Sequence, residues 1–283
     1  MKLSDINLRD PYILPFDGNY YMYGTRGFNY TGFDVYVSSD LENWSEPKSV
    51  FEGYDGFWAD KEFWAPEVYE YNGKFVMFAS LKSDKHHRGT QVLISDSPLG
   101  PFIEHSKDAV TPHEWESLDG TLYIEDGEPY MIFCHEWTQI KNGTVCSTRL
   151  SHDLKKRISE PEILWYAKDA ACFDDFSKEE GYITDGPFLM KIDGELICIW
   201  STICNGSYME LISRSDNGKL DGNWSIDKKA LFEDDGGHGM IFKTFDNTYK
   251  FIFHTPNTIK EERPCLLDIN LLDLRDNNKQ CYN

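Results

Sequence analysis

The sequence predicts an all-β protein, a five-bladed β-propeller whose four-stranded antiparallel blades surround a central channel. One hairpin pattern occurs five times along the 283 residues, and its turns recur about every 55 residues, which is room for four strands per copy. The turns are Asn-Gly, Asp-Gly or, in the last copy, Asp-Asn. Aromatic residues make up 15% of the chain, which suits β-structure. A two-domain β-sandwich is the structural alternative, but it gives no reason for five evenly spaced copies.

Each hairpin consists of an apolar strand, a tight polar turn and a second, more aromatic strand. Asn-Gly and Asp-Gly favour such turns because both residues tolerate a positive φ. The turns begin at Asp17, Asn72, Asp126, Asp193 and Asp246. The expected strand pairs are 11–14 with 20–23, 66–69 with 75–78, 121–124 with 130–133, 187–190 with 196–199, and 239–242 with 249–252.

Outer strands complete the predicted blades. Third strands are expected at 34–37, 91–94, 145–150 and 209–213, and short fourth strands at 162–164 and 230–232. The longest interval between turns contains an extra segment, 169–181, with Phe173 and Phe176. We expect this segment to be a short helix or a lid beside the site, with a surface excursion as the alternative. The chain, 1–283, is interpreted as one catalytic propeller domain.

The charge of the chain excludes several classes of partner. It carries 48 acidic and 28 basic side chains, so its net charge is −20 and its pI is about 4.7. We therefore expect no binding of nucleic acid or of an anionic membrane. No stretch approaches the roughly 20 apolar residues of a membrane span. A small neutral partner fits better, and the 8 Trp, 16 Tyr and 18 Phe residues also suit stacking on sugars.

The cysteines and the N-terminus predict a cytoplasmic location. The seven cysteines are odd in number and show no C-x-x-C spacing, so we expect reduced, mostly buried thiols and no zinc cluster. Residues 1–10 lack the basic and apolar regions of a signal peptide.

The positions before the first strand of each hairpin carry unusual chemistry. In a propeller these positions gather around the axis at one mouth. They include Asp10, Asp119, Asp185 and His238. An Asp before Gly or Pro, taken alone, is more often just a turn residue, but three carboxylates and an imidazole at equivalent places in a repeat predict one cluster. Clustered carboxylates push their pKa values apart, which separates a general acid from a general base.

Five short motifs carry a resemblance to a known family. They are Arg9-Asp10-Pro11-Tyr12-Ile13, Trp64-Ala65-Pro66-Glu67-Val68, Leu118-Asp119-Gly120-Thr121, Gly186-Pro187-Phe188-Leu189 and Gly237-His238-Gly239-Met240. In their order and spacing the chain resembles glycoside hydrolase family 43 from residue 8 to about 269. The resemblance implies a five-bladed propeller and an inverting enzyme that acts on arabinose-, xylose- or galactose-containing glycans. It also implies Asp10 as general base, Asp119 as the residue that orients the acid and tunes its pKa, and His238 near a divalent ion or water cluster in the axial channel.

One position departs from the family pattern. The family's general acid is a Glu directly before Gly-Pro, whereas this chain has Asp185. An Asp is one methylene shorter and has a lower reference pKa, about 3.9 against 4.3. Either Asp185 is the acid and its position is compensated, or another group supplies the proton. Glu136 is the candidate for that group, because the strand that ends before it returns to the same mouth.

Further residues are candidates for the substrate site. The predicted substrate-binding residues are Trp64, Glu67, His135, Glu136 and Arg263. Trp64 is the expected sugar platform, with core packing as the alternative. Arg263 resembles an arginine with which some family members hold sugar hydroxyls, with a surface role as the alternative. A single His gives little metal specificity, so Ca²⁺ with water and carbonyl ligands is the expected ion at His238. Other residues at strand ends that return to the mouth are also candidates for its lining, with a solvated strand end as the alternative for each. They are Thr25, Arg26, Ser80, Lys82, Thr202 and His254.

The sequence therefore predicts an inverting exo-glycosidase for arabinofuranosyl, xylosyl or related galactosyl linkages of a small oligosaccharide. Asp10 would take a proton from the attacking water, and Asp185 or Glu136 would protonate the glycosidic oxygen. The enzymatic alternatives are a retaining fructosidase or transferase and an inverting phosphorylase. A phosphorylase would need a basic cluster at the mouth, which the motifs do not show. The non-enzymatic alternative is a carbohydrate-binding propeller that has lost its acid at Asp185.

Overall fold

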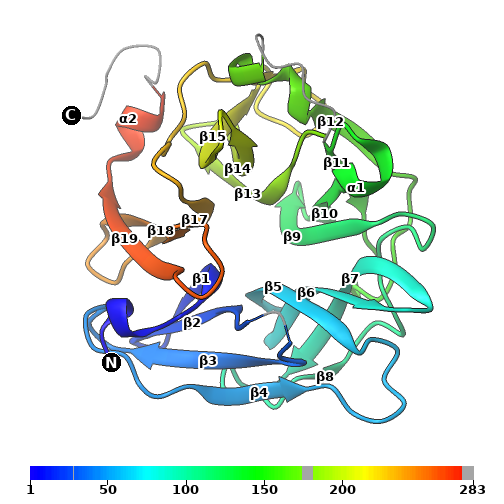
Figure 1. Cartoon of the computed structure of the whole chain (residues 1–283), viewed down its shortest axis with the longest axis vertical. Helices are drawn as coiled ribbons and strands as arrows, with labels where there is room; N and C mark the ends of the chain where they lie inside the picture. The colour runs from blue at the N-terminus through cyan, green and yellow to red at the C-terminus, as the bar shows by residue number, and fades with distance from the viewer. Residues whose placement is uncertain (28, 174–180, 276–283) are drawn as a thin grey trace.

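The computed structural model describes residues 1–27, 29–173 and 181–275, and they form a ring of five antiparallel sheets (Figure 1). The predicted five-bladed propeller is confirmed. The first strands of neighbouring blades contact one another around the axis, and each later strand lies further out. No helix in the described residues is long and apolar enough to cross a membrane.

The blades follow chain order. Blade one contains β1 (Arg9–Phe16), β2 (Asn19–Thr25), β3 (Gly32–Ser38) and β4 (Lys48–Glu52). Blade two contains β5 (Lys61–Tyr71), β6 (Lys74–Ser83), β7 (His86–Ser95) and β8 (Ile103–Glu104). Blade three contains β9 (Ser117–Glu125), β10 (Glu128–His135), β11 (Thr144–Arg149) and β12 (Glu162–Tyr166). Blade four contains β13 (Asp185–Ile192), β14 (Glu195–Cys204), β15 (Ser207–Ser215) and β16 (Trp224–Ile226). Blade five contains β17 (Gly237–Lys243), β18 (Tyr249–Thr255) and β19 (Arg263–Ile269).

Five short helices accompany the strands in the described residues. They are the 3₁₀ helices η1 (Leu3–Asp5), η2 (Ala167–Asp169) and η3 (Ala171–Phe173), and the α-helices α1 (Trp137–Ile140) and α2 (Leu271–Arg275). Two of them, η2 and η3, lie between blades three and four. The extra segment predicted at 169–181 contributes η3, whereas residues 174–180, with Phe176, lie outside the described residues. The six cysteines that the structure describes are free thiols, and Cys281 lies outside this part of the chain.

Two expectations about the outer strands are wrong. The described part of blade five has three strands, not four, because the chain turns after β19 into α2, whose Leu274 packs against the blade with 2% exposure. The fourth strand of blade four is β16 rather than 230–232. β16 pairs with residues 213–215 of β15, and Phe232 makes only an isolated bridge to Glu210 on the other part of that strand.

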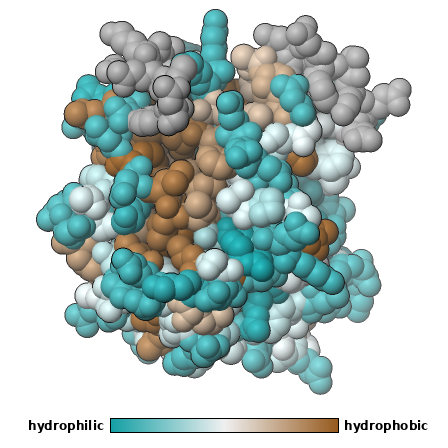
Figure 2. Space-filling view, turned by 60° about the vertical axis from the view of Figure 1, so that its left-hand side comes forward, coloured by the Kyte–Doolittle hydropathy of each residue, from teal (hydrophilic) through white to brown (hydrophobic). Residues whose placement is uncertain are grey.

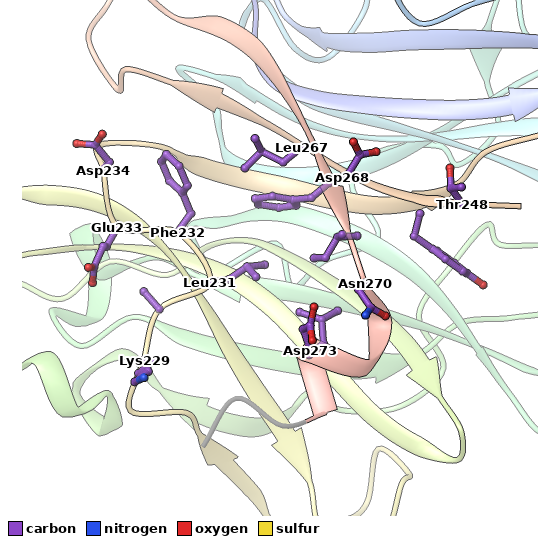
Figure 3. Close-up of a pocket in the computed structure, with 15 residues that line it drawn as sticks. Lys229, Leu231, Phe232, Glu233, Asp234, Thr248, Leu267, Asp268, Asn270 and Asp273 are labelled. Carbon is purple, nitrogen blue, oxygen red and sulfur yellow. The ribbon is translucent and has the colours of Figure 1, made fainter. Parts of the chain in front are cut away.

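The displaced segment 229–234 borders an apolar groove on the side of the ring. A cavity of about 950 Å³ lies between this segment, β18, β19 and α2. Figure 2 shows it as a hydrophobic hollow framed by polar side chains. In Figure 3, Leu231 and Phe232 line it from the displaced segment and Leu267 from β19. None of the predicted site residues lines this groove.

Aromatic and aliphatic side chains fill the spaces between blades. Phe33 and Phe63 lie 5.8 Å apart between blades one and two, and Trp165 and Trp200 lie 6.0 Å apart between blades three and four. Tyr20 of blade one meets the ring of Phe242 of blade five at 6.0 Å. Most of the aromatic residues thus stabilise the propeller, and side-chain packing closes the ring between its first and last blades.

Every first strand carries a β-bulge near its axial end, where one residue has a positive φ. These residues are Asp10 (51°), Ala65 (44°), Asp119 (56°), Gly186 (52°) and His238 (50°). Bulges redirect side chains and are common beside active sites. Asp10, Asp119 and His238 therefore occupy equivalent places, as predicted. Asp185 does not, because it stands one residue before the bulge residue of its blade.

Candidate active site

Asp10 is an ionised carboxylate at the axial end of β1. It is 8% exposed, its Oδ2 accepts a 2.5 Å hydrogen bond from Thr25 Oγ1, and its Oδ1 lies 3.2 Å from His238 Nδ1. Burial alone would raise the pKa of this carboxyl, but the charges of His238 and Arg9 lower it to about 2. Asp10 can therefore accept a proton at neutral pH, as a general base must.

His254 fixes the main chain of Asp10. The N–H of Asp10 donates to His254 Nδ1 at 3.2 Å, so this nitrogen is an acceptor and the ring proton lies on Nε2, 3.4 Å from Asn257 Oδ1. Burial lowers the pKa of His254 to about 4, and the ring is neutral at physiological pH. His254 thus acts as a hydrogen-bonding support for the base.

Asp119, on β9 of blade three, bonds to both neighbouring blades. Its N–H donates to Ser80 Oγ at 2.8 Å, and its Oδ2 accepts the N–H of Gly186 at 3.0 Å. Burial, and then the charge of Asp10, raise the pKa of Asp119 to about 7. Because Gly186 follows Asp185, this bond fixes the main chain that carries the predicted acid. That geometry suits the orienting role that the resemblance implies for Asp119.

Asp185 is a carboxyl that holds its proton close to neutral pH. It is partly exposed at the start of β13, and its Oδ2 accepts a 3.2 Å hydrogen bond from the hydroxyl of Tyr208. Burial and the nearby charge of Asp119 raise its pKa to about 7. Asp10 and Asp185 therefore prefer opposite protonation states, which is the requirement for an acid and base pair.

His238 lies between the carboxylates. Its Nδ1 is 3.2 Å from Asp10 and 3.8 Å from Asp119 Oδ2, and its N–H donates to Ser201 Oγ at 2.6 Å. A Cβ at position 186 would lie 2.6 Å from His238 Cδ2, so only glycine fits at Gly186.

The side chains around His238 do not by themselves form a metal site. Its Nδ1 is directed at Asp10, and the described residues contain no group of three or more His, Cys, Asp or Glu side chains that could hold a metal ion. Calcium would need water or main-chain carbonyl ligands here, as expected from the single His in the sequence. The ion stays a prediction.

An ion pair across the mouth joins blades two and three. The guanidinium of Arg88 lies over the ring of Trp64, 4.4 Å from its centroid, and pairs with Glu62 Oε2 at 2.6 Å and with Glu136 Oε2. Glu136 also accepts a 2.8 Å hydrogen bond from Thr138. Glu136 is therefore occupied as an acceptor, which suits binding better than proton donation. Sequence reasoning missed Arg88, because nothing local distinguishes it from the solvated charges beside it.

Three other predicted binding residues make their contacts with protein groups outside the carboxylate cluster. Glu67 lies behind the cluster, where Tyr69 and Thr121 donate to its Oε2. His135 stacks on Trp115 at 4.0 Å. Arg263 donates to the carbonyls of Ser4 at 2.9 Å and Glu262 at 2.8 Å, which ties it to the N-terminal segment.

The remaining strand-end candidates divide into two groups. Thr25, Ser80 and His254 belong to the carboxylate cluster through the bonds above. Arg26 pairs with Asp34, Lys82 with Glu116 at 3.0 Å, and Thr202 donates to the Ile183 carbonyl at 2.8 Å. These three therefore serve local structure.

A five-bladed propeller that gathers carboxyls of opposite protonation state at one mouth defines the protein as a glycoside hydrolase of the acid–base type. The chain belongs to glycosyl hydrolase family 43, whose sequence model matches residues 4–268.

Individual relatives agree with this family. The crystal structure of an endo-arabinase from Bacteroides thetaiotaomicron VPI-5482 is 35% identical, covers 95% of this chain and 96% of its own, and superposes with a TM-score of 0.89. An extracellular endo-α-(1→5)-L-arabinanase of Bacillus subtilis is 26% identical over 145 residues, 47% of this chain and 45% of that protein. The match thus spans about half the length of that relative. An extracellular exo-α-(1→5)-L-arabinofuranosidase of Cellvibrio japonicus is 22% identical over 267 residues, 85% of this chain and 72% of its own.

Proposed function

We propose that this protein is an inverting exo-glycosidase that removes terminal arabinofuranosyl units from small α-1,5-linked oligosaccharides. The observation that carries the proposal is the pair of carboxyls with opposite proton affinities: the pKa of Asp10 is about 2 and that of Asp185 is about 7. The names of the relatives described above favour arabinose over xylose or galactose.

The reaction follows from the state of each group. Asp10, ionised and held by Thr25, takes a proton from a water that attacks the anomeric carbon. Asp185, protonated, gives its proton to the glycosidic oxygen as that bond breaks. Asp119 accepts the N–H of Gly186, and its charge raises the proton affinity of Asp185. His238 Nδ1 lies 3.2 Å from Asp10 Oδ1, and its charge favours the ionised form of the base.

The ion pairs of Arg9 and Arg88 support water rather than phosphate as the nucleophile. Arg9 pairs with Glu262 at 3.1 Å, and Arg88 pairs with Glu62 at 2.6 Å and with Glu136. Phosphate binding would need such guanidinium groups to be available. This argues against the phosphorylase alternative.

The Arg88–Glu136 pair supports exo action. It joins blade two to blade three beside Trp64, and in the proposal it forms the barrier on one side of the mouth. An enzyme that cuts inside a polymer needs a groove that is open on both sides of the cleavage point. Trp64, with Arg88 on one face, is then a wall of the terminal-sugar site.

The cytoplasmic location stays a prediction. Free thiols at the six described cysteines support it, whereas two of the relatives are named extracellular. Cell fractionation with an antibody against the protein would decide between the two.

The test is a panel of nitrophenyl glycosides followed by arabino-oligosaccharides of defined length. We expect hydrolysis of the α-L-arabinofuranoside, single arabinose units from the oligosaccharides, and inverted configuration in the first-formed product by proton NMR. Asp10→Asn should lower kcat by about 10²- to 10⁴-fold on every substrate. Internal cleavage would overturn the exo assignment, and a retained product would favour the retaining class. No hydrolysis of any glycoside would favour a binding propeller.

A further inference from the structure

Tyr208 contacts the predicted acid directly and is held from both sides. It lies on β15 with 2% exposure, and its hydroxyl donates to Asp185 Oδ2 at 3.2 Å. Its ring stacks on His254, with centroids 5.6 Å apart and planes 25° apart. His254 in turn accepts the N–H of Asp10. Tyr208 therefore links the support of the base to the acid.

The phenol remains a hydrogen-bond donor at every working pH. Burial, and then the charges of Asp185 and Asp10, raise the pKa of Tyr208 well above its ordinary value. Its proton is thus always available for Asp185 Oδ2. The hydrogen bond leaves Oδ1 as the oxygen of Asp185 that can carry a transferable proton.

The main chain next to Asp185 is fixed, so only rotation of the side chain can change the direction of its carboxyl. Gly186 is fixed by its bond to Asp119 and by its contact with the His238 ring. Asp185 also stands one residue before the bulge, so its carboxyl is not aimed by the bulge as those of Asp10 and Asp119 are. An unheld carboxyl on a short side chain would rotate among several orientations.

We propose that Tyr208 is a positioning residue that turns the carboxyl of Asp185 so that Oδ1 delivers its proton to the glycosidic oxygen. In this chain Tyr208 compensates for an acid that is one methylene shorter. The inference rests on the proposed function, because it takes Asp185 as the proton donor. The groups that face Asp185 from the elements around it are Asp10 of β1, Asp119 of β9, Cys134 of β10, Glu136 after β10, Glu210 and Tyr208 of β15, and His238 of β17.

Tyr208→Phe tests the proposal because it removes only the hydroxyl and keeps the ring that stacks on His254. With arabinobiose, whose leaving group needs a proton, we expect kcat to fall by about tenfold or more while KM changes less than twofold. With nitrophenyl arabinofuranoside, whose leaving group needs little protonation, kcat should change less than threefold. In an Asp185→Ala background the same substitution should have no further effect, because Tyr208 acts through Asp185.

Tyr23→Phe is the matched control. Tyr23 is also fully buried, but its hydroxyl donates to the Pro98 carbonyl at 2.6 Å rather than to a carboxyl of the cluster. Tyr23→Phe should leave the ratio of kcat for arabinobiose to kcat for nitrophenyl arabinofuranoside unchanged. Thermal melts and circular dichroism of both variants check that the fold is retained.

A crystal structure of the Tyr208→Phe variant tests the proposal without any turnover. The carboxyl of Asp185 is expected to adopt a different or a mixed orientation, and an unchanged single orientation would overturn the proposal. Equal losses on both substrates, or an effect that persists without Asp185, would also overturn it. Failure of the proposed function itself is distinguishable, because it appears as a wild-type protein that hydrolyses neither substrate.

Discussion

Asp119→Asn is the substitution that best separates charge from geometry in this site. Asparagine tolerates the positive φ at this position and can still accept the N–H of Gly186 through its amide oxygen. Only the negative charge is lost. After burial, that charge is the largest contribution that raises the pKa of Asp185 to about 7.

The expected result is a shift of the alkaline limb of the pH profile toward lower pH. A general acid is active when protonated, so activity falls as the pH rises through its pKa. Two unit charges 4 Å apart interact by about 4 kcal/mol at an effective dielectric constant of 20. Asp119, whose own pKa is about 7, is only partly ionised in this range. We therefore expect a shift of roughly one pH unit, which corresponds to about 1.4 kcal/mol.

The assay is kcat/KM for arabinobiose between pH 4 and pH 9, which follows the free enzyme. Glu67→Gln is the matched control, because Glu67 is also buried with a pKa of about 7 but bonds to Thr121 and Tyr69 rather than to the Asp185 segment. It should leave the limb in place. A limb that does not move in Asp119→Asn, or that moves to higher pH, would refute the electrostatic account of Asp185.

Three further predictions concern the donor, the buried carboxyls and the ion. In Asp185→Ala, kcat for arabinobiose should fall by about 10²-fold or more, while much of the activity on the nitrophenyl glycoside remains. Glu136→Gln should instead affect both substrates alike, chiefly through KM. The reverse pattern would make Glu136 the donor. Glu210 is fully buried with a pKa raised to about 8, so the stability it contributes is present at low pH and lost as the pH rises through that value. Because the unfolded chain's carboxyl has the ordinary pKa of 4.5, the loss begins near that pH and is complete above about 8. The melting temperature of Glu210→Gln should therefore match that of wild type near pH 4.5 and exceed it by a few degrees at pH 9. Calorimetry at both pH values checks this, and an equal difference at both would contradict it. Dialysis against EDTA should lower the melting temperature and added Ca²⁺ should restore it if an ion binds at His238; an unchanged melting curve would leave His238 with its hydrogen bonds alone.

The fold could be predicted from the sequence because its signals are local. A two-residue turn that needs positive φ selects Asn, Asp or Gly, and Asp17, Asn72, Asp126 and Asp193 indeed adopt positive φ in the structure. Repetition of that signal then implies radial symmetry. The exceptions were the outer strands, whose pairing depends on contacts between segments that lie far apart in the chain. β16 forms the fourth strand of blade four, whereas 230–232 makes only an isolated bridge to β15.

The candidate site could be predicted only in part. Asp10, Asp119 and His238 were found because they precede successive hairpins and resemble family motifs. The bulges that aim them have no common residue type, since the five positive-φ positions hold Asp, Ala, Asp, Gly and His. The offset of Asp185 from the bulge position therefore appears only in the structure.

What the sequence alone determined is the ring and the residue types that enter its mouth, because turn propensity and the spacing of hairpins act within a few residues of one another. What the tertiary structure decided is which charges meet. Arg88 of blade two pairs with Glu136 of blade three, and Tyr208 on β15 donates to Asp185 on β13, two strands closer to the axis. Such contacts depend on strand register, and on burial that gives Asp10 a pKa of about 2 and Asp185 one of about 7. A carboxyl's proton affinity is set by the charges and the solvent around it, and these come from segments far apart in the chain.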